Sequence, residues 1–266
     1  MKKTFIIITI AVIFCVLSAC SVKMHTVVNE NKAVSSVTKQ TECSKVEKKT
    51  ETTSKKTESA SKAKQENTKP VSDFSMKNAL FIGDSRTIGL MEYSGLPSDF
   101  FANVGMSVYN IYDKKISVPN VGKLSLENLL TKKQYNVIYL MLGINELGYN
   151  IETTASEYKK LVSFINSKQP DAVIIIQKNL HVTKVKSASE KYINNERLDK
   201  LNSKIAENTN NKNIFSIDAN ILFDDRNNAL DANKTADNVH LYAKYYSEWG
   251  NWLTKESEKI FKEINN

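Results

Sequence analysis

Five residues spread along the 266-residue chain have the types that acyl transfer through a covalent serine intermediate needs: Ser85, Gly105, Asn145, Asp237 and His240. A serine hydroxyl is a weak nucleophile at neutral pH, so it needs an adjacent base, and histidine suits that role. Asp237 lies three residues before His240, close enough to orient the imidazole and to stabilise it once it is charged. The sequence therefore predicts a catalytic triad of Ser85, His240 and Asp237.

The same chemistry needs rigid hydrogen-bond donors for the oxyanion that forms when an ester carbonyl is attacked. We expect these donors to be the backbone N–H groups of Ser85 and Gly105 and the side-chain amide of Asn145. Glycine at position 105 allows the backbone to approach the substrate closely. Loss of any one donor is expected to lower the rate by about 10²–10³.

The candidate residues lie close to short apolar runs that indicate buried strands. Continuous apolar runs are typical of strands covered on both faces of a parallel sheet. Apolar residues at helical spacing lie between them, over 158–165, 198–205 and 245–253, and Thr154 begins a pattern typical of a helix N-cap. The alternation predicts a doubly wound α/β fold with its site at the carboxyl ends of the strands. The predicted strands are 79–82, 100–104, 137–142, 172–176 and 214–217.

Over residues 77–266 the chain resembles the SGNH/GDSL hydrolase superfamily, whose four blocks carry Ser, Gly, Asn and His in this order. The resemblance implies a flavodoxin-like three-layer α/β/α sandwich with a central, mostly parallel, five-stranded sheet. It also implies hydrolysis of esters or acetyl esters, with no cofactor and no metal ion. The blocks are Phe81-Ile82-Gly83-Asp84-Ser85-Arg86, Gly105, Leu142-Gly143-Ile144-Asn145-Glu146 and Asp237-Asn238-Val239-His240.

Several residues near these blocks have roles that the sequence leaves less defined. Arg86 stands where the family has leucine, and we expect it to pack and form local salt bridges rather than contact substrate. Glu146 fits either a substrate contact or a structural acid. His181 has no matching acid nearby and is predicted to be non-catalytic. Trp249 and Trp252 have helical spacing, which predicts core packing rather than a sugar-binding platform.

The N-terminus has the features of a bacterial export signal. Two lysines precede the apolar run 5–16, which is shorter than the roughly 20 residues that a membrane-spanning helix needs. The following Leu17-Ser18-Ala19-Cys20 resembles a lipobox, in which the cysteine becomes the lipidated first residue of the mature chain. We expect a signal peptide over 1–19 and a lipid anchor on Cys20; plain secretion and an uncleaved membrane anchor are the alternatives.

Residues 20–74 are predicted to form a disordered tether, and residues 75–266 one folded domain. The stretch 21–70 has no aromatic residue and carries 11 lysines and 6 glutamates, so it can bury too little apolar surface to fold. The net charge of +8 falls mostly outside residues 71–266, which hold 24 basic and 23 acidic residues. This distribution argues against nucleic-acid binding. Three cysteines and three histidines, without a Cys-x-x-Cys pair, argue against a disulfide scaffold and a zinc cluster.

The sequence thus predicts a monomeric, lipid-anchored, extracytoplasmic serine esterase. The expected substrate is a small acyl ester, with an O-acetylated glycan first, because the anchor places the domain at the cell envelope and related enzymes often act on such glycans. Long-chain lipid esters are less expected, because the domain has no extended apolar lid segment. Two alternatives remain: an O-acyltransferase of envelope glycans that uses the same triad, and a non-catalytic envelope-binding lipoprotein.

Overall fold

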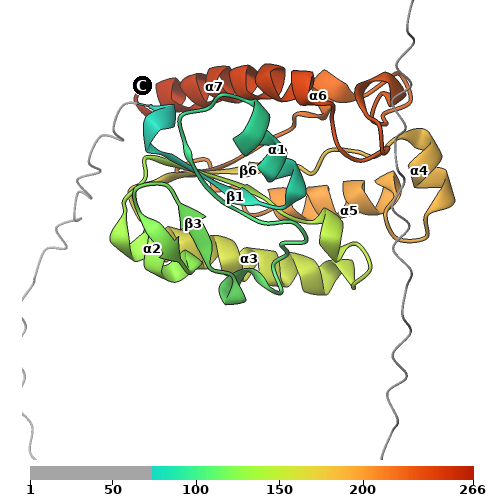
Figure 1. Ribbon diagram of the computed structural model, residues 1–266. Coiled ribbons are helices and arrows are strands. Elements are labelled where there is room, and N and C mark those ends of the chain that lie inside the picture. The colour runs from blue at the N-terminus through green and yellow to red at the C-terminus, as the bar shows by residue number, and fades with distance from the viewer. Residues whose placement is uncertain (1–73) are drawn as a thin grey trace, which may run out of the picture. The chain divides into compact units, whose positions relative to one another are not determined.

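The computed structural model describes residues 74–266, which fold into layers of helices on both sides of one sheet (Figure 1). The predicted signal peptide, the lipidation site at Cys20 and nearly all of the predicted tether lie outside the described residues. Within the described part, no helix is long and apolar enough to cross a membrane.

A five-stranded sheet forms the middle layer, and all of its neighbouring strands are parallel. The strand order is β2-β1-β5-β6-β7, a doubly wound arrangement. The predicted α/β fold with a central, mostly parallel, five-stranded sheet is therefore confirmed. The strands are β1 (Ala79–Gly83), β2 (Asp99–Ala102), β5 (Val137–Met141), β6 (Val173–Gln177) and β7 (Ile214–Ile217).

The sheet has a core on each face, because successive side chains of a strand point in opposite directions. Leu80 and Ile82 of β1 join one core, whereas Phe81 joins the other and stacks on Tyr139 of β5 with ring centroids 4.2 Å apart. Burial on both faces explains why these strands are continuous apolar runs. The first core is covered by α2 (Leu126–Lys132), α3 (Ile151–Lys168) and α5 (Asn195–Ala206), and the second by α1 (Ser85–Tyr93), α6 (Asn220–Phe223) and α7 (Ala243–Ile264).

The C-terminal helix α7 carries the two tryptophans. Trp249 is fully buried in the second core, and Trp252 is partly buried against the same core. Both therefore pack inside the domain, as their helical spacing predicts.

Two local features differ from the sequence-based expectation. Helix α3 begins at Ile151, and its N-cap is Asn150, whose Oδ1 accepts the N–H of Thr153 at 2.9 Å. The prediction of a cap at Thr154 is wrong, because this residue is buried inside the first turn. A β-hairpin follows β2, and its turn includes Asn120 in the left-handed region with φ 60°. Its strands are β3 (Ile116–Val118) and β4 (Gly122–Leu124), and the remaining α-helix is α4 (Lys184–Ser189).

The carboxyl ends of β1, β2 and β5 lie at one edge of the sheet, where the strand order reverses. The chain passes from β1 to β2 on one side and then returns to β5 on the other side of β1. Ser85 follows β1, Gly105 follows β2 and Asn145 follows β5. Such a switch point is where open α/β sheets bind their ligands. The topology therefore collects three of the five predicted residues, and the loop before α7 adds Asp237 and His240.

Candidate active site

The candidate nucleophile, Ser85, is the first residue of α1 and comes directly after the turn that ends β1. Asp84 caps the helix, because its Oδ1 accepts the N–H of Arg86 at 2.9 Å. The turn needs glycine at position 83: a Cβ there would lie 2.7 Å from the carbonyl oxygen of Met141 and 2.0 Å from Oγ1 of Thr87. This tight turn brings the serine to the edge of the sheet, where its side chain is half-buried rather than enclosed.

The structure brings Ser85, His240 and Asp237 into one hydrogen-bonded line. Ser85 Oγ lies 2.8 Å from Nε2 of His240, and Nδ1 of His240 lies 2.6 Å from Oδ2 of Asp237. A carboxylate only accepts hydrogen bonds, so Nδ1 carries the proton and Nε2 faces the serine hydroxyl as an acceptor. This is the arrangement that a histidine needs to remove a proton from serine.

Asp237 is held as a carboxylate by the loop that it belongs to. Its Oδ1 accepts the backbone N–H groups of His240 at 2.7 Å and of Val239 at 2.9 Å. Burial opposes the charge, but these hydrogen bonds and the one from the imidazole outweigh it and lower the pKa of Asp237 to about 2. The group is therefore ionised throughout the neutral range and orients the imidazole.

The three predicted oxyanion donors follow the carboxyl ends of three neighbouring strands, β1, β2 and β5. Gly105 is exposed with φ 70°, a left-handed conformation that favours glycine. Within the described residues, the backbone N–H groups of Ser85 and Gly105 donate to no protein acceptor. Asn145 is also exposed, and its Nδ2 donates to the carbonyl of Met106 at 2.9 Å. One amide hydrogen thus ties Asn145 to the Gly105 loop, and the second is left for substrate.

Arg86 does not face substrate. It is 1% exposed, and its guanidinium donates to the carbonyl of Leu180 at 2.7 Å and to Oδ1 of Asn179 at 3.2 Å. Its Nε lies 3.8 Å from Oδ1 of Asp84. The expectation of packing with a local salt bridge is confirmed.

Glu146 is a buried structural acid. The side chain is fully buried, and its Oε1 accepts the N–H of Val108 at 2.8 Å. Burial raises the pKa of Glu146 to about 7, with the hydrogen bond from Val108 opposing the shift and the charge of Asp84 adding to it. The residue joins the turn that carries Asn145 to the loop that carries Gly105. The structure thereby decides between the two roles that the sequence left open.

His181 has two acidic partners that sequence proximity did not reveal. Its Nδ1 lies 2.6 Å from Oδ2 of Asp224, and its Nε2 lies 2.8 Å from Oδ1 of Asp199. Burial disfavours the charged ring, but these two carboxylates outweigh it and raise the pKa of His181 to about 9. The interpretation that His181 has no matching acid is therefore wrong: the two acids are 18 and 43 residues away along the chain. Both ring nitrogens are occupied by these carboxylates, which leaves neither for substrate.

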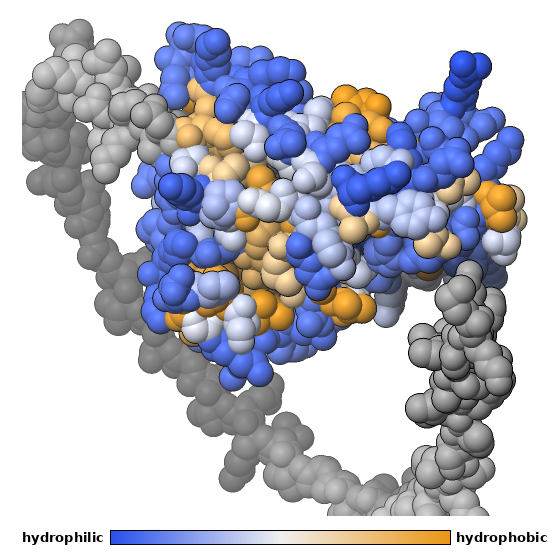
Figure 2. Space-filling model, turned by 45° about the horizontal axis from the view of Figure 1, so that its top comes forward, coloured by the Kyte–Doolittle hydropathy of each residue, from blue (hydrophilic) through white to orange (hydrophobic). Residues whose placement is uncertain are grey.

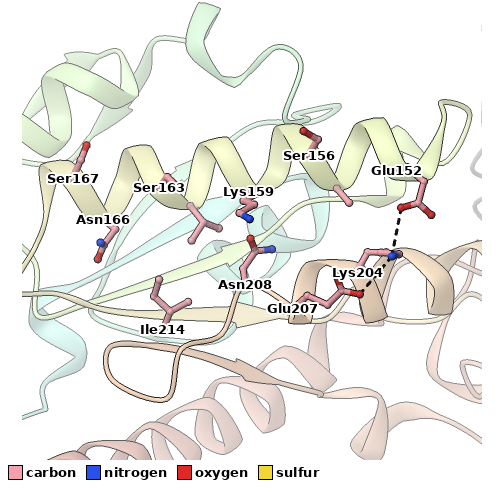
Figure 3. A pocket seen from close by; sticks show the side chains of 12 residues that line it. Glu152, Ser156, Lys159, Ser163, Asn166, Ser167, Lys204, Glu207, Asn208 and Ile214 are labelled. Carbon is pink, nitrogen blue, oxygen red and sulfur yellow. Dashed lines mark ion pairs between the residues drawn. The ribbon is translucent and has the colours of Figure 1, made fainter.

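A pocket of about 550 Å³ lies elsewhere, between α3 and α5 (Figure 3). Its lining is mostly polar and charged, and Lys204 bridges Glu152 and Glu207 at 3.5 Å each. None of the triad or oxyanion residues lines this pocket. In residues 74–266 no group of three or more His, Cys, Asp or Glu side chains is placed to hold a metal ion.

Comparison with known proteins agrees with this fold. The profile of the GDSL-like Lipase/Acylhydrolase family matches residues 81–247, more than half of the chain. No curated protein matches the chain. Similar solved structures include a GDSL-like lipase from Bacteroides thetaiotaomicron (15% identity, 69% of this chain and 89% of that one, TM-score 0.53). A proposed acylhydrolase from Bacteroides fragilis is similar (15% identity, 70% and 88%, TM-score 0.53), as is a proposed platelet activating factor from Streptococcus pneumonia (18% identity, 67% and 83%, TM-score 0.52). The chain belongs to the GDSL-like lipase/acylhydrolase family and is a carboxylic ester hydrolase.

Proposed function

We propose that the chain is an extracytoplasmic serine esterase that hydrolyses small acyl esters, acetyl esters first, through a Ser85–His240–Asp237 triad. The observation that carries the proposal is the continuous hydrogen-bonded line from Ser85 Oγ through both nitrogens of His240 to Asp237, with contacts of 2.8 Å and 2.6 Å. Residues 155 positions apart in the sequence meet at this line.

Acylation begins when Ser85 Oγ attacks the carbonyl carbon of the ester and its proton passes to Nε2 of His240. The carbonyl electrons move onto oxygen, and the N–H groups of Ser85, Gly105 and Asn145 hold the oxyanion. Asp237 stabilises the charged imidazole. The bond from the carbonyl carbon to the alcohol oxygen then breaks, and His240 returns the proton to that oxygen, so the alcohol leaves.

Deacylation repeats these steps with water as the nucleophile. His240 removes a proton from water, and the resulting hydroxide attacks the acyl-serine carbonyl. The bond between the acyl carbon and Ser85 Oγ breaks, the proton on His240 passes to Oγ, and the carboxylic acid leaves. A sugar hydroxyl in place of water gives acyl transfer, which is the alternative that the test below separates.

The openness of the site favours a small acyl group on a larger alcohol. The side chains of His240 and Asp237 are 39% and 55% exposed, and Gly105 and Asn145 are exposed beside them. A long acyl chain needs an extended apolar channel to leave water. Hydrophobic residues on the face in Figure 2 occur in several places among hydrophilic ones. The exposure of His240, Asp237, Gly105 and Asn145 supports acetyl over long-chain esters.

An exposed pair of tyrosines, each four residues after a predicted oxyanion donor along the chain, favours a carbohydrate as the alcohol. Tyr109 follows Gly105 by four residues, Tyr149 follows Asn145 by four, and their ring centroids lie 4.8 Å apart. Both rings are exposed, at 38% and 58%. Tyrosine combines an apolar ring face with a polar hydroxyl, which suits the mixed C–H and O–H surface of a sugar. We therefore propose O-acetylated glycans as the substrate class.

The location rests on the N-terminal sequence alone. The apolar run 5–16 and the lipobox-like Leu17-Ser18-Ala19-Cys20 support export and lipid anchoring at Cys20. The test is replacement of Cys20 by serine in cells fed radiolabelled palmitate. We expect label in the wild-type chain only, and equal labelling of the variant contradicts the anchor.

The catalytic proposal is tested with p-nitrophenyl acetate and the full chain, purified in a detergent that contains no ester. We expect turnover that is lost in Ser85→Ala, and covalent labelling of the wild type but not of the variant by a fluorophosphonate. Acetate release from acetylated oligosaccharides is then compared with hydrolysis of p-nitrophenyl palmitate. Tyr149→Ala is expected to raise KM for the oligosaccharides and to leave p-nitrophenyl acetate unchanged.

Each negative outcome has a definite meaning. Equal rates in the wild type and Ser85→Ala, with no labelling, contradict the serine esterase. Fluorophosphonate labelling of the wild type, together with transfer of the acetyl group to an added sugar and no free acetate, identifies a transferase. Faster hydrolysis of the palmitate ester contradicts the small-acyl proposal.

A further inference from the structure

Residues 179–183, between β6 and α4, are buried although they have no regular secondary structure. No residue of this bridging segment is more than 7% exposed. Irregular backbone usually lies at the surface, because its polar groups need partners. Here the residues find partners on several parts of the fold, and these partners include the neighbours of both Ser85 and His240 along the chain.

The first end of the bridging segment is bonded to the residue that follows the nucleophile. Arg86, the residue after Ser85, donates to the carbonyl of Leu180 at 2.7 Å and to the side chain of Asn179 at 3.2 Å. Asn179 Nδ2 donates in turn to the carbonyl of Leu142, the residue after β5, at 3.0 Å. The start of the segment is therefore fixed to α1 and to the strand that precedes Asn145.

The middle of the bridging segment is held by hydrogen bonds between His181 and two carboxylates. His181 contacts Asp224, at the end of α6, and Asp199 of α5, and its backbone N–H donates to Oδ1 of Asn220 at 2.8 Å. Hydrogen bonds to charged groups inside a domain are stronger than neutral ones. The segment thus has little freedom to shift between its two ends.

The other end of the bridging segment is attached to the loop that carries the base. Thr183 donates from its backbone N–H to the carbonyl of Asn238 at 3.1 Å and from its hydroxyl to Oδ1 of Asn238 at 2.8 Å. Asn238 lies between Asp237 and His240 and has φ 70°. Two hydrogen bonds from one buried residue thus hold the tip of an otherwise exposed loop.

The base of that loop is closed by contacts of its own, and Val239 beside His240 packs against the first core. Thr235 and Leu241 form an isolated antiparallel bridge, and Tyr242 N–H donates to the carbonyl of Lys234 at 2.8 Å. These contacts join the two ends of the loop to each other, and the hydrogen bond between His240 and Ser85 links the loop to the nucleophile directly. The contact between Thr183 and Asn238 adds a second link, through the bridging segment.

We propose that residues 179–183 set the position of the two halves of the triad relative to each other, with Thr183 as the positioning residue for His240 and Asp237. The proposal rests on the serine esterase mechanism above. Its physical basis is that a misplacement of about 1 Å between reacting groups lowers the rate by about 10²-fold. Loss of the Thr183 hydroxyl contact leaves one backbone hydrogen bond to hold Asn238, so the distance between Ser85 Oγ and His240 Nε2 is held less firmly near 2.8 Å.

The test compares Thr183→Val with Thr183→Ser in the full chain, using p-nitrophenyl acetate and fluorophosphonate labelling. Valine keeps the branched shape and removes the hydroxyl, whereas serine keeps the hydroxyl. Because Thr183 Oγ1 also caps α4 by accepting the N–H of Lys186 at 3.3 Å, Asn238→Gly removes the same contact from the other side. Glycine accepts the left-handed conformation at position 238.

We expect Thr183→Val to lower kcat and the labelling rate by about 10- to 100-fold with KM unchanged. Thr183→Ser should stay within about threefold of the wild type, with circular dichroism confirming that each variant is folded. The double variant of Thr183→Val and Asn238→Gly should be no slower than the slower single variant, because both remove one contact. An unchanged kcat in Thr183→Val, or multiplied effects in the double variant, overturns the proposal. Activity that survives Ser85→Ala overturns the proposed function first, and this inference with it.

Discussion

Glu146 offers a direct test of how burial acts on the stability of this domain. The side chain is fully buried, and Oε2 has no hydrogen-bond partner among the described residues. Burial raises the pKa of Glu146 from 4.5 to about 7. The folded chain therefore binds this proton more tightly than the unfolded chain does, and the stability that the proton provides is complete at low pH. It is lost as the pH rises through 7.

The change is Glu146→Gln, which removes the charge and keeps an oxygen that can accept the N–H of Val108. A pKa difference of about 2.5, at about 1.4 kcal/mol for each pKa unit, corresponds to about 3 kcal/mol. About 2.5 kcal/mol of this stabilisation is lost between pH 5 and pH 8. We expect the free energy of unfolding of the wild type to fall by this amount relative to the variant over that range.

The assay is urea unfolding of both chains at pH 5 and pH 8, followed by circular dichroism. Other titrating groups, His181 among them, are the same in both chains and cancel in the comparison. Glu92→Gln, at an exposed position of α1, is the matched control and should follow the wild type at both pH values. If Glu146→Gln and the wild type lose stability in parallel between pH 5 and pH 8, the reasoning from burial is refuted.

Three further variants probe the site and its support. Asn145→Ala removes an oxyanion donor together with the bond to the carbonyl of Met106, so kcat for p-nitrophenyl acetate should fall by about 10²-fold. Asp237→Asn should lower kcat by about 10³-fold with KM unchanged, because an amide does not hold the imidazole in the tautomer that accepts the serine proton; burst kinetics check the acylation step. His181 stabilises the folded chain fully below its unfolded pKa of 6.5 and loses that contribution as the pH rises through about 9. The difference in unfolding free energy between His181→Gln and the wild type should therefore be about 3 kcal/mol smaller at pH 10 than at pH 6.

The strands of the sheet were predictable because both faces are covered, which leaves runs such as 137–142 and 172–176 without polar interruptions. The β3–β4 hairpin was not predictable in the same way. Each of its strands has only three residues. None of the residues of the second strand, Gly122–Leu124, is fully buried. The start of α3 was misplaced because Asn150 and Thr154 both have cap-forming side chains, and packing of Thr154 beneath Tyr109 decides between them.

The candidate catalytic residues were predictable because each carries chemistry that few side chains supply and each lies beside a strand end or before the last helix. The groups that support them were not. Asp199 and Asp224 reach His181 from two different helices, and Thr183 reaches Asn238 across 55 residues of sequence. Such contacts depend on how the layers pack, and no local pattern of residue types encodes them.

The buried acids behind the site raise the question of why the fold keeps them. Asp84 and Glu146 are both fully buried, and each has one oxygen without a hydrogen-bond partner among the described residues. Buried, incompletely paired carboxylates destabilise a folded chain. Their other oxygens hold the N–H of Arg86 beside the nucleophile and the N–H of Val108 in the loop of Gly105. A Glu146→Gln variant that is more stable at pH 8 but slower would mean that the charged acceptor holds the oxyanion loop more firmly than an amide does. A variant that is more stable and equally fast would mean that the amide suffices, and that the charge at position 146 contributes nothing to catalysis.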